Sequence, residues 1–297
     1  MRIVSLVPHA TELLFALDLG DQVVGVTHEC DFPDEARARR HVTRDRLPPG
    51  LDAGEIDAAV RSFTERGEAI YDLDEQALKE LQPDLIVTQA LCPVCAVSSE
   101  DVEAIAATMD TAPAVMSLDP TTYGETIGDV KTVAKATGSE MAALGLIARA
   151  AKRVDAIAAA LGDEPRRPRV AAIEWFDPLM TAGHWTPQLI EMAGGEDVLG
   201  FAGEHSEQTT WEIVAAAKPD VVIAMPCGYD AERSRQEAHR FASELRTLGA
   251  GEVVAVNASA YFSRPGPRLV DGLELLAHIL HPELVPSAPG EALTVEL

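Results

Sequence analysis

The sequence predicts an α/β protein with two Rossmann-like lobes, each built on a parallel central sheet, joined by one long rigid helix. Its 297 residues are enough for two hydrophobic cores. Residues 139–161 form an uninterrupted helical pattern that would span roughly 35 Å, about the width of a domain. On each side of this pattern, short apolar runs alternate with helical segments. The chain is therefore expected to divide into lobes at 1–138 and 163–297 and a linking helix at 139–162.

The two ends of the long helix carry residues that favour helix boundaries. Ser139 is an expected N-cap after Gly138, and Gly162 lies where a C′ glycine belongs. An ordinary surface helix inside one large domain is the alternative interpretation. The similar order of strands and helices on both sides favours the linking helix.

Each lobe is expected to repeat the same order of elements. In the first lobe the pattern predicts strands at 2–6, 22–26, 84–88 and 114–118, with helices ending near 19 and spanning 55–66, 74–81, 99–109 and 122–136. In the second lobe it predicts strands at 169–175, 220–224 and 252–256, helices at 186–194, 210–217 and 269–280, and a loop at 176–183. Pro83-Asp84 and Pro219-Asp220 each follow a helix and precede a buried strand. Apolar, non-alternating strands between helices predict parallel sheets covered on both faces.

Charge and hydropathy exclude several classes of partner. The chain has 24 basic and 48 acidic residues, and its net charge of −24 would repel nucleic acid and anionic membranes. No apolar run approaches the roughly 20 residues of a membrane span. The chain begins directly with a strand pattern and shows no signal-peptide pattern. We therefore expect a cytoplasmic protein as the sequence stands, or a periplasmic or extracellular one if an export signal has been removed.

The loops that follow the predicted strands hold most of the reactive and aromatic residues. Ligands of open parallel sheets bind beyond the carboxyl ends of the strands. All four cysteines and two of the three tryptophans fall on these loops, which would face one another across a cleft between the lobes. A binding protein for a sizeable ligand is therefore expected. The loop residues are His9, His28, Glu29, Cys30, Gln89, Cys92, Cys95, Asp119, Trp175, His184, Trp185, Cys227, Tyr229, Tyr261, Phe262 and Arg264.

Cys92 and Cys95 form a Cys-x-x-Cys pair, a spacing used for redox chemistry or for two thiolate ligands of a metal. No second pair follows, but His28 and Cys30 would complete a four-ligand zinc or iron site if their loop is the neighbour in space. Three interpretations stay open: unligated thiols that line the cleft, a metal or cofactor site, and a redox pair.

Trp175 and Trp185 indicate a flat ligand, since aromatic residues make up only 5% of the chain and these two lie within eleven residues of each other. A place in the core is the alternative for both. His184 is as well suited to a backbone hydrogen bond as to metal ligation, and His9 follows Pro8 at a strand end. The chain has no phosphate-binding glycine loop, no Gly-x-Ser-x-Gly elbow and no His-Glu-x-x-His, so an enzyme is not expected.

Several segments resemble one known family. They are 2–12 (RIVSLVPHATE), 81–87 (LQPDLIV), 193–196 (AGGE), 218–223 (KPDVVI) and 263–268 (SRPGPR). They look like signatures of the helical-backbone substrate-binding proteins (cluster A-II, class III), which serve import of cobalamin, haem and iron-siderophores. The resemblance spans nearly the whole chain and is strongest to the cobalamin-binding component of bacterial cobalamin ABC uptake.

The resemblance implies two lobes on one long helix, little hinge motion and a ligand held by aromatic side chains. It also implies an acidic residue on each lobe that docks onto arginines of a membrane permease. Glu212 matches the position in the second lobe. The position in the first lobe falls at Gln76, with Glu75 beside it.

The sequence thus predicts a non-catalytic, monomeric protein that holds cobalamin or a related corrinoid or tetrapyrrole in the cleft. One alternative is a cytoplasmic metal- or metal-chelate-binding protein that uses His28, Cys30, Cys92 and Cys95. The other is a thiol-dependent corrinoid-processing enzyme. The expected ligand-binding residues are His9, Glu174, Trp175, His184, Trp185, Tyr261, Phe262 and Arg264.

Overall fold

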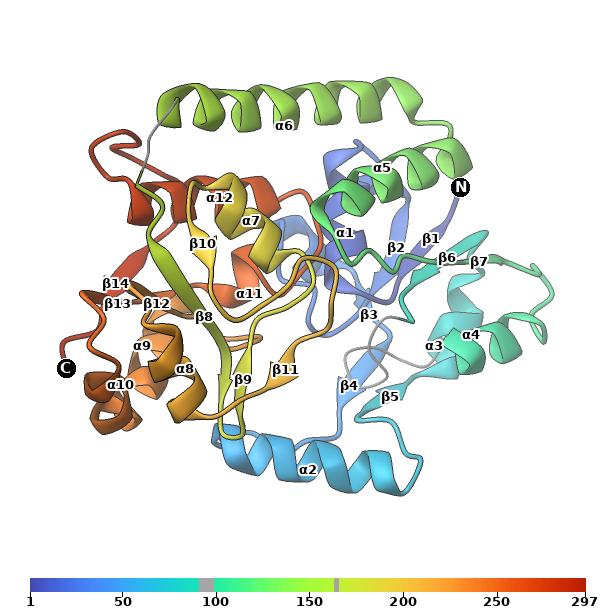
Figure 1. Cartoon of the computed structure of the whole chain (residues 1–297). Helices are drawn as coiled ribbons and strands as arrows, with labels where there is room; N and C mark the ends of the chain where they lie inside the picture. The colour runs from blue at the N-terminus through green and yellow to red at the C-terminus, as the bar shows by residue number, and fades with distance from the viewer. Residues whose placement is uncertain (91–98, 163–165) are drawn as a thin grey trace. The chain divides into compact units, whose positions relative to one another are not determined.

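The computed structural model describes residues 1–90, 99–162 and 166–297. Two compact units make up the chain (Figure 1). The first unit comprises Met1–Pro120 and Ile127–Ile147, and the second comprises Thr121–Thr126 and Ala148–Leu297.

A five-stranded sheet forms the centre of the first unit, in the order β3-β2-β1-β6-β7. Every pairing in it is parallel, as the unbroken apolar runs predict. A separate antiparallel pair, β4 with β5, was not predicted. The strands are β1 (Ile3–Ser5), β2 (Val23–Val26), β3 (Arg40–His41), β4 (Thr43–Asp45), β5 (Tyr71–Leu73), β6 (Leu85–Thr88) and β7 (Ala114–Ser117).

Helices cover both faces of this sheet. Side chains alternate between the faces of β1, so that Ile3 packs with Leu14 of α1 whereas Val4 packs with Leu78 of α3. The cluster around Ile3 also includes residues of α5 and α6, and the cluster around Val4 includes residues of α4. The helical segments up to residue 161 are α1 (Pro8–Ala16), η1 (Gly20–Gln22), η2 (Asp34–Ala38), α2 (Ala53–Glu65), α3 (Glu75–Leu81), α4 (Ser99–Ala106), α5 (Tyr123–Thr137) and α6 (Glu140–Leu161).

The sheet of the second unit mixes a parallel centre with antiparallel edges. Strands β10, β8, β12 and β13 are parallel, whereas β9, β11 and β14 pair antiparallel. The predicted loop at 176–183 is wrong in part, because β8 continues to Phe176 and β9 pairs back against it. The strands are β8 (Arg169–Phe176), β9 (Leu179–Thr181), β10 (Glu196–Asp197), β11 (Glu207–Gln208), β12 (Val221–Ala224), β13 (Glu252–Val256) and β14 (Ala292–Thr294).

Helices also cover both faces of the second sheet. One face packs against α8, α9 and α10, whereas α7 and α12 lie side by side on the other face (Figure 1). Helices α9 and α10 occupy a stretch for which the sequence predicted no element. The helices are α7 (Thr186–Met192), α8 (Trp211–Ala217), α9 (Ala231–Arg240), α10 (Ala242–Leu248), α11 (Ala258–Tyr261) and α12 (Leu269–Leu280).

The Pro-Asp motif of the first unit joins a helix end to a central strand. Gln82, just before the motif, has a left-handed backbone with φ of 44° and ends α3. Asp84 accepts a hydrogen bond from the backbone N–H of Arg2 at 2.7 Å, and the Arg2 guanidinium donates to the Leu81 carbonyl at 2.7 Å. Arg2 therefore satisfies one of the carbonyls left without a partner at the helix end.

The second unit repeats this junction residue for residue. Lys218 is left-handed with φ of 50° and ends α8. Asp220 accepts from the backbone N–H of Arg169 at 2.9 Å, and the Arg169 guanidinium donates to the Ala217 carbonyl at 2.9 Å. The repeated sequence motif is therefore a repeated structural unit, which a sequence pattern alone could only suggest.

Helix α6 matches the long helix that the sequence predicts, and it begins in the first unit and ends in the second. Gly162 follows it with a left-handed φ of 51°. In the second unit, Arg153 ties α6 to α12 by hydrogen bonds to Asp271 at 2.5 Å and to Glu274 at 2.6 and 2.8 Å.

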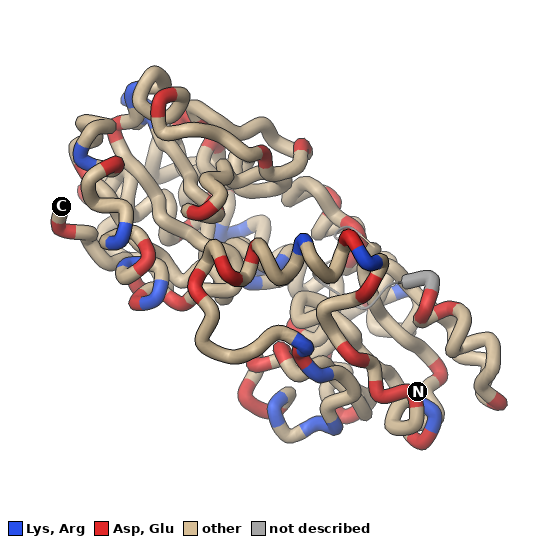
Figure 2. The backbone as a smooth tube through the Cα atoms, turned by 90° about the horizontal axis from the view of Figure 1, so that it is seen from below, with Lys and Arg blue, Asp and Glu red and all other residues tan. Residues whose placement is uncertain are grey.

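None of the helices in the described part of the chain is long and apolar enough to cross a membrane. Acidic residues are spread along helices and loops throughout the chain (Figure 2).

Candidate ligand-binding site of the second unit

The strand order of the second unit places a candidate site beyond the carboxyl end of β8. From β8 the chain crosses to β10 on one side, and later to β12 and β13 on the other, so the order reverses between β8 and β12. Ligands of open α/β sheets bind at such a switch point. The last pair between β8 and β12 joins Ile173 to Ala224, and β8 then continues through Glu174, Trp175 and Phe176. Glu174 and Trp175 therefore lie at this crevice.

A hydrogen bond and an edge-on ring contact hold Trp175 in place. Its indole N–H donates to the Asp177 carbonyl at 2.9 Å, and its ring meets the edge of Tyr229 with 5.6 Å between centroids. The guanidinium of Arg233 lies 3.7 Å from the centroid of the Tyr229 ring. Both contacts restrict the rings, so the partly exposed Trp175 is held in one orientation, and its role as a platform for a flat ligand stays a prediction.

Glu174 places a carboxyl group next to this platform. Its Oε2 accepts a hydrogen bond from the Ser206 hydroxyl at 2.7 Å, and its backbone carbonyl accepts from the N–H of Cys227 at 3.1 Å. Burial raises the pKa of Glu174, whereas hydrogen bonds from Ser206 and from the backbone of Gly183 act in the opposite direction. The carboxyl is therefore a group that ionises less readily than an exposed glutamate.

Substitution of Glu174 by glutamine should raise the free energy of unfolding at pH 8, by about 1 kcal/mol. A raised native pKa means that the folded chain binds more protons than the unfolded chain above pH 4.5, so wild-type stability falls as pH rises through that window. Glutamine removes this loss and still accepts from Ser206. Urea unfolding at pH 8 and pH 4 measures the effect, which should vanish at pH 4.

Glu212→Gln is the matched control with the opposite sign. Hydrogen bonds from Thr210 and from its own backbone lower the pKa of Glu212, so its ionised form contributes stability above pH 4.5 that is lost in acid. The control variant should therefore be less stable than wild type at pH 8. Equal pH profiles for wild type and Glu174→Gln would contradict the burial argument.

A pair of imidazoles lies beside Glu174. Nε2 of His184 and Nδ1 of His205 are 3.0 Å apart. His184 has φ of 54°, and its backbone is held by two hydrogen bonds, from its N–H to the Glu204 carbonyl at 2.6 Å and from the Gly203 N–H to its own carbonyl at 2.8 Å. Burial and the charge of His205 lower the pKa of His184.

Trp185 and Phe262 are buried rather than displayed. Trp185 is 6% exposed and Phe262 is 4% exposed, and the Trp185 indole donates to the Phe262 carbonyl at 2.7 Å. Tyr261 is half-buried with the Arg268 guanidinium 6.0 Å from its ring centroid, and the carbonyl of the half-buried Arg264 accepts from Gly266 at 2.8 Å. Ligand contact by these four predicted residues stays a prediction.

The predicted site residues of the first unit lie at the carboxyl ends of β1 and β2. His9 is buried in α1. Nδ1 of His28 lies 2.7 Å from the Thr43 hydroxyl, and the His28 ring packs against Tyr71 with 5.2 Å between centroids. Because the strand order reverses between β1 and β6, this edge is the switch point of the first unit.

Cys30 is buried in the hydrophobic core rather than displayed on a loop. Its sulfur lies 3.0 Å from the Thr11 hydroxyl and 3.2 Å from the Thr27 hydroxyl. Cys92 and Cys95 lie outside the described residues. Within residues 1–90, 99–162 and 166–297, no group of three or more His, Cys, Asp or Glu side chains could hold a metal ion. The hypotheses that depend on Cys92 and Cys95 therefore stay predictions.

The two acidic residues assigned to permease docking are exposed in the first turns of their helices. Glu75 is the first residue of α3 and forms an ion pair with Lys79, in which Oε2 of Glu75 and Nζ of Lys79 are 3.2 Å apart. Glu212 lies in the first turn of α8, beside the exposed Ile213. Both positions present a carboxylate on the surface of a unit.

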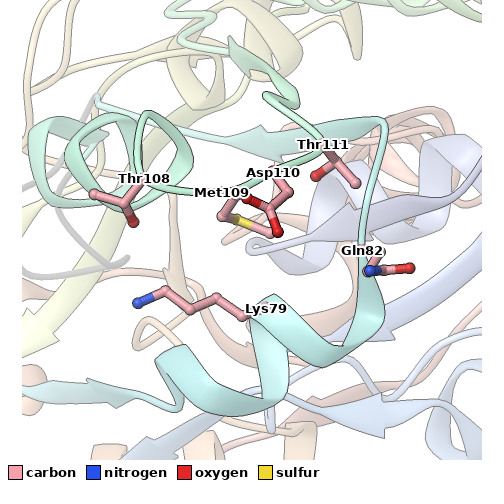
Figure 3. Close-up of a pocket in the computed structure, with 6 residues that line it drawn as sticks. All are labelled: Lys79, Gln82, Thr108, Met109, Asp110 and Thr111. Carbon is pink, nitrogen blue, oxygen red and sulfur yellow. The ribbon is translucent and has the colours of Figure 1, made fainter.

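A pocket of about 140 Å³ in the first unit is separate from these sites. Lys79 and Gln82 line it from the end of α3, and 108–111 line it from the connection between α4 and β7 (Figure 3). Both segments lead into the amino ends of strands β6 and β7. The pocket therefore lies at the opposite edge of the sheet from the switch point.

Sequence reasoning missed three residues of the second-unit site: His205, Ser206 and Arg233. His205 and Ser206 precede the two-residue strand β11, which has no recognisable strand pattern. Arg233 belongs to the unpredicted helix α9. The only sequence signal was the polar Glu-His-Ser triplet at 204–206, which is too common to identify a site.

Two α/β units of this kind, connected by a long helix and carrying side chains for a ligand at strand ends, define a substrate-binding protein. The chain belongs to the periplasmic binding protein family, whose model matches residues 3–258. This membership confirms the predicted resemblance and the predicted fold class.

Three relatives illustrate what the chain is similar to. The vitamin B12-binding protein of Vibrio cholerae is 23% identical over 289 residues, covering 92% of this chain and 86% of that protein. Its solved structure matches with a TM-score of 0.66 at 20% identity, covering 96% of this chain and 98% of the other.

The second relative is an uncharacterized ABC transporter substrate-binding lipoprotein of Bacillus subtilis, 23% identical over 292 residues, covering 95% of this chain and 80% of that protein. The third is the periplasmic heme-binding protein of Roseiflexus sp. RS-1 in apo form, with a TM-score of 0.68 at 21% identity, covering 96% of this chain and 98% of that one. The structural matches establish the fold, and the relatives' names leave corrinoid, haem and other ligands open.

Proposed function

We propose that this protein binds cobalamin or a related corrinoid or tetrapyrrole without transforming it, and that it delivers the ligand to an ABC permease. The observation that carries the proposal is the oriented Trp175 platform, backed by Tyr229 and Arg233 at the switch point of the second unit. A flat macrocycle is the kind of ligand that stacks on such a platform. The vitamin B12-binding relative supports the same ligand class.

The net charge of the chain favours a corrinoid over haem. Haem carries propionate carboxylates, which a net charge of −24 would repel. The corrin ring carries neutral amides, which can donate to and accept from Glu174, His184 and Arg264. His9, which is buried in α1, stays a predicted ligand contact.

Delivery to a permease would use Glu75 and Glu212 as docking carboxylates. Both are exposed, and each lies in the first turn of a helix. The substrate-binding lipoprotein among the relatives is named as part of an ABC transporter. A periplasmic or extracellular location of an exported form fits this role, and the monomeric state stays a prediction.

A titration of cobalamin into wild type and Trp175→Ala tests the proposal. Wild type should bind saturably, and the variant should bind about 2- to 12-fold more weakly, because an aromatic stacking contact contributes about 0.5–1.5 kcal/mol. Trp175→Phe is the matched control and should keep most of the affinity. Tighter binding of haemin than of cobalamin would move the protein to the haem-binding class, and binding of neither would overturn the proposal.

A further inference from the structure

The paired histidines of the second unit differ in their accessibility. His205 is exposed, whereas His184 is half-buried and packs against Trp185 with 5.5 Å between ring centroids. The two backbone hydrogen bonds to Gly203 and Glu204 keep His184 in a left-handed conformation, which a residue with a side chain adopts at an energetic cost. The backbone of His184 therefore holds its ring in a fixed position next to the ring of His205.

The hydrogen bond between the rings determines which nitrogen is available to a ligand. When Nδ1–H of His205 donates to Nε2 of His184, the lone pair of His205 lies on Nε2, at the outer end of the exposed ring. Histidines that ligate metals commonly have their second nitrogen fixed by a hydrogen bond of this kind. A metal on Nε2 of His205 would select this tautomer.

The number of ligands indicates the form of the metal. A free zinc or iron ion needs three or four protein ligands, and the part of the chain that the structure describes offers no group of three. One imidazole nitrogen is sufficient for a metal that a macrocycle already holds and that has one exchangeable axial position. Ser206, next to His205, donates a hydrogen bond to the carboxyl group of Glu174 and so ties the segment that carries His205 to the end of β8.

We propose that Nε2 of His205 is an axial ligand to the metal of the bound macrocycle and that His184 is its positioning residue, an inference that rests on the proposed function. The Nε2 lone pair forms the new metal–nitrogen bond, and the axial water leaves with its own electron pair. The metal keeps its oxidation state, and the Nδ1 proton of His205 stays in the hydrogen bond to His184.

Two forms of cobalamin test this step. Aquocobalamin has an exchangeable axial water, whereas cyanocobalamin has a tightly held cyanide. Wild type should shift the visible spectrum of aquocobalamin but not that of cyanocobalamin, and it should bind aquocobalamin at least about tenfold more tightly. In His205→Ala the spectral shift should disappear and the ratio of the two affinities should fall toward one. Added imidazole should restore the shift.

Two further variants separate ligation from folding. His184→Phe should also lower the affinity ratio toward one, because substitutions behind a metal ligand weaken metal binding. His239→Ala, an exposed histidine of α9, is the matched control and should keep both the ratio and the spectrum.

Each outcome has one meaning. Cobalamin binding with the same spectral shift in wild type and His205→Ala overturns the axial-ligand inference and leaves the proposed function standing. Binding by wild type without a shift does the same. If only haemin binds, a change in its Soret band that is lost in His205→Ala supports the inference. If neither cobalamin nor haemin binds, the proposed function fails and the inference fails with it.

Discussion

Truncation of Trp185 to alanine should lower the free energy of unfolding by about 3 to 5 kcal/mol. The side chain is 6% exposed, and its indole N–H donates to the Phe262 carbonyl at 2.7 Å. Alanine would leave a large cavity and a buried carbonyl without its donor, and both losses act in the same direction. Urea unfolding followed by circular dichroism measures the change.

Trp185→Phe separates the two contributions. Phenylalanine keeps most of the volume and removes the donor, so it should cost about 1 to 3 kcal/mol. The same pair of variants distinguishes a core role from a ligand role. A change below about 1 kcal/mol in Trp185→Ala, combined with a large loss of cobalamin affinity, would mean that the indole serves the ligand and would contradict the packing prediction.

Replacement of Gly183 by alanine should destabilise the second unit by about 1 to 3 kcal/mol, as overpacking of a close contact does. A Cβ at Gly183 would lie 2.5 Å from the carbonyl carbon of His205 and 2.5 Å from the backbone nitrogen of Ser206. These are backbone atoms, so no rotation of a side chain relieves the contact. The segment that carries His205 and Ser206 would have to move away from His184 and Glu174.

The displacement predicts a second, independent result for Gly183→Ala. The His184–His205 and Glu174–Ser206 hydrogen bonds join the same two segments that an alanine at Gly183 would push apart. Cobalamin affinity should therefore fall together with the melting temperature. Gly124→Ala in α5 is the matched control, since its Cβ would meet only the Thr122 hydroxyl, at 3.9 Å. That control should be neutral or slightly stabilising. Wild-type stability in Gly183→Ala would contradict the close approach of the two segments.

Elements with a long or repeated pattern could be predicted from the sequence. The helical period of 140–161, bounded by Ser139 and Gly162, gave α6, and the apolar run after Pro83 gave the buried strand β6. The same reasoning placed Glu174 and Trp175 at the carboxyl end of a parallel strand, because strand direction and connection order follow from the alternation of strands and helices. These features are local in the chain.

Short strands and the side chains that they position could not be predicted. Strands β9 and β11 have three and two residues, too few for a period to be visible. Yet their antiparallel pairing, Thr181 with Glu207 and Met180 with Gln208, carries the segment at 203–206 to His184. For this reason His205 and Ser206 were missed.

Two α/β halves, their parallel strands, the long helix and the strand ends at which a ligand is expected could all be inferred from the order of residues. The burial of Cys30 and Trp185, the support of Trp175 by Tyr229 and Arg233, and the hydrogen bond between the two histidines became visible in the folded chain. The physical reason is the range of the interactions. Periodicity and capping act within a few residues, whereas Glu174 and Ser206 are 32 residues apart and meet only through the register of the sheet edge.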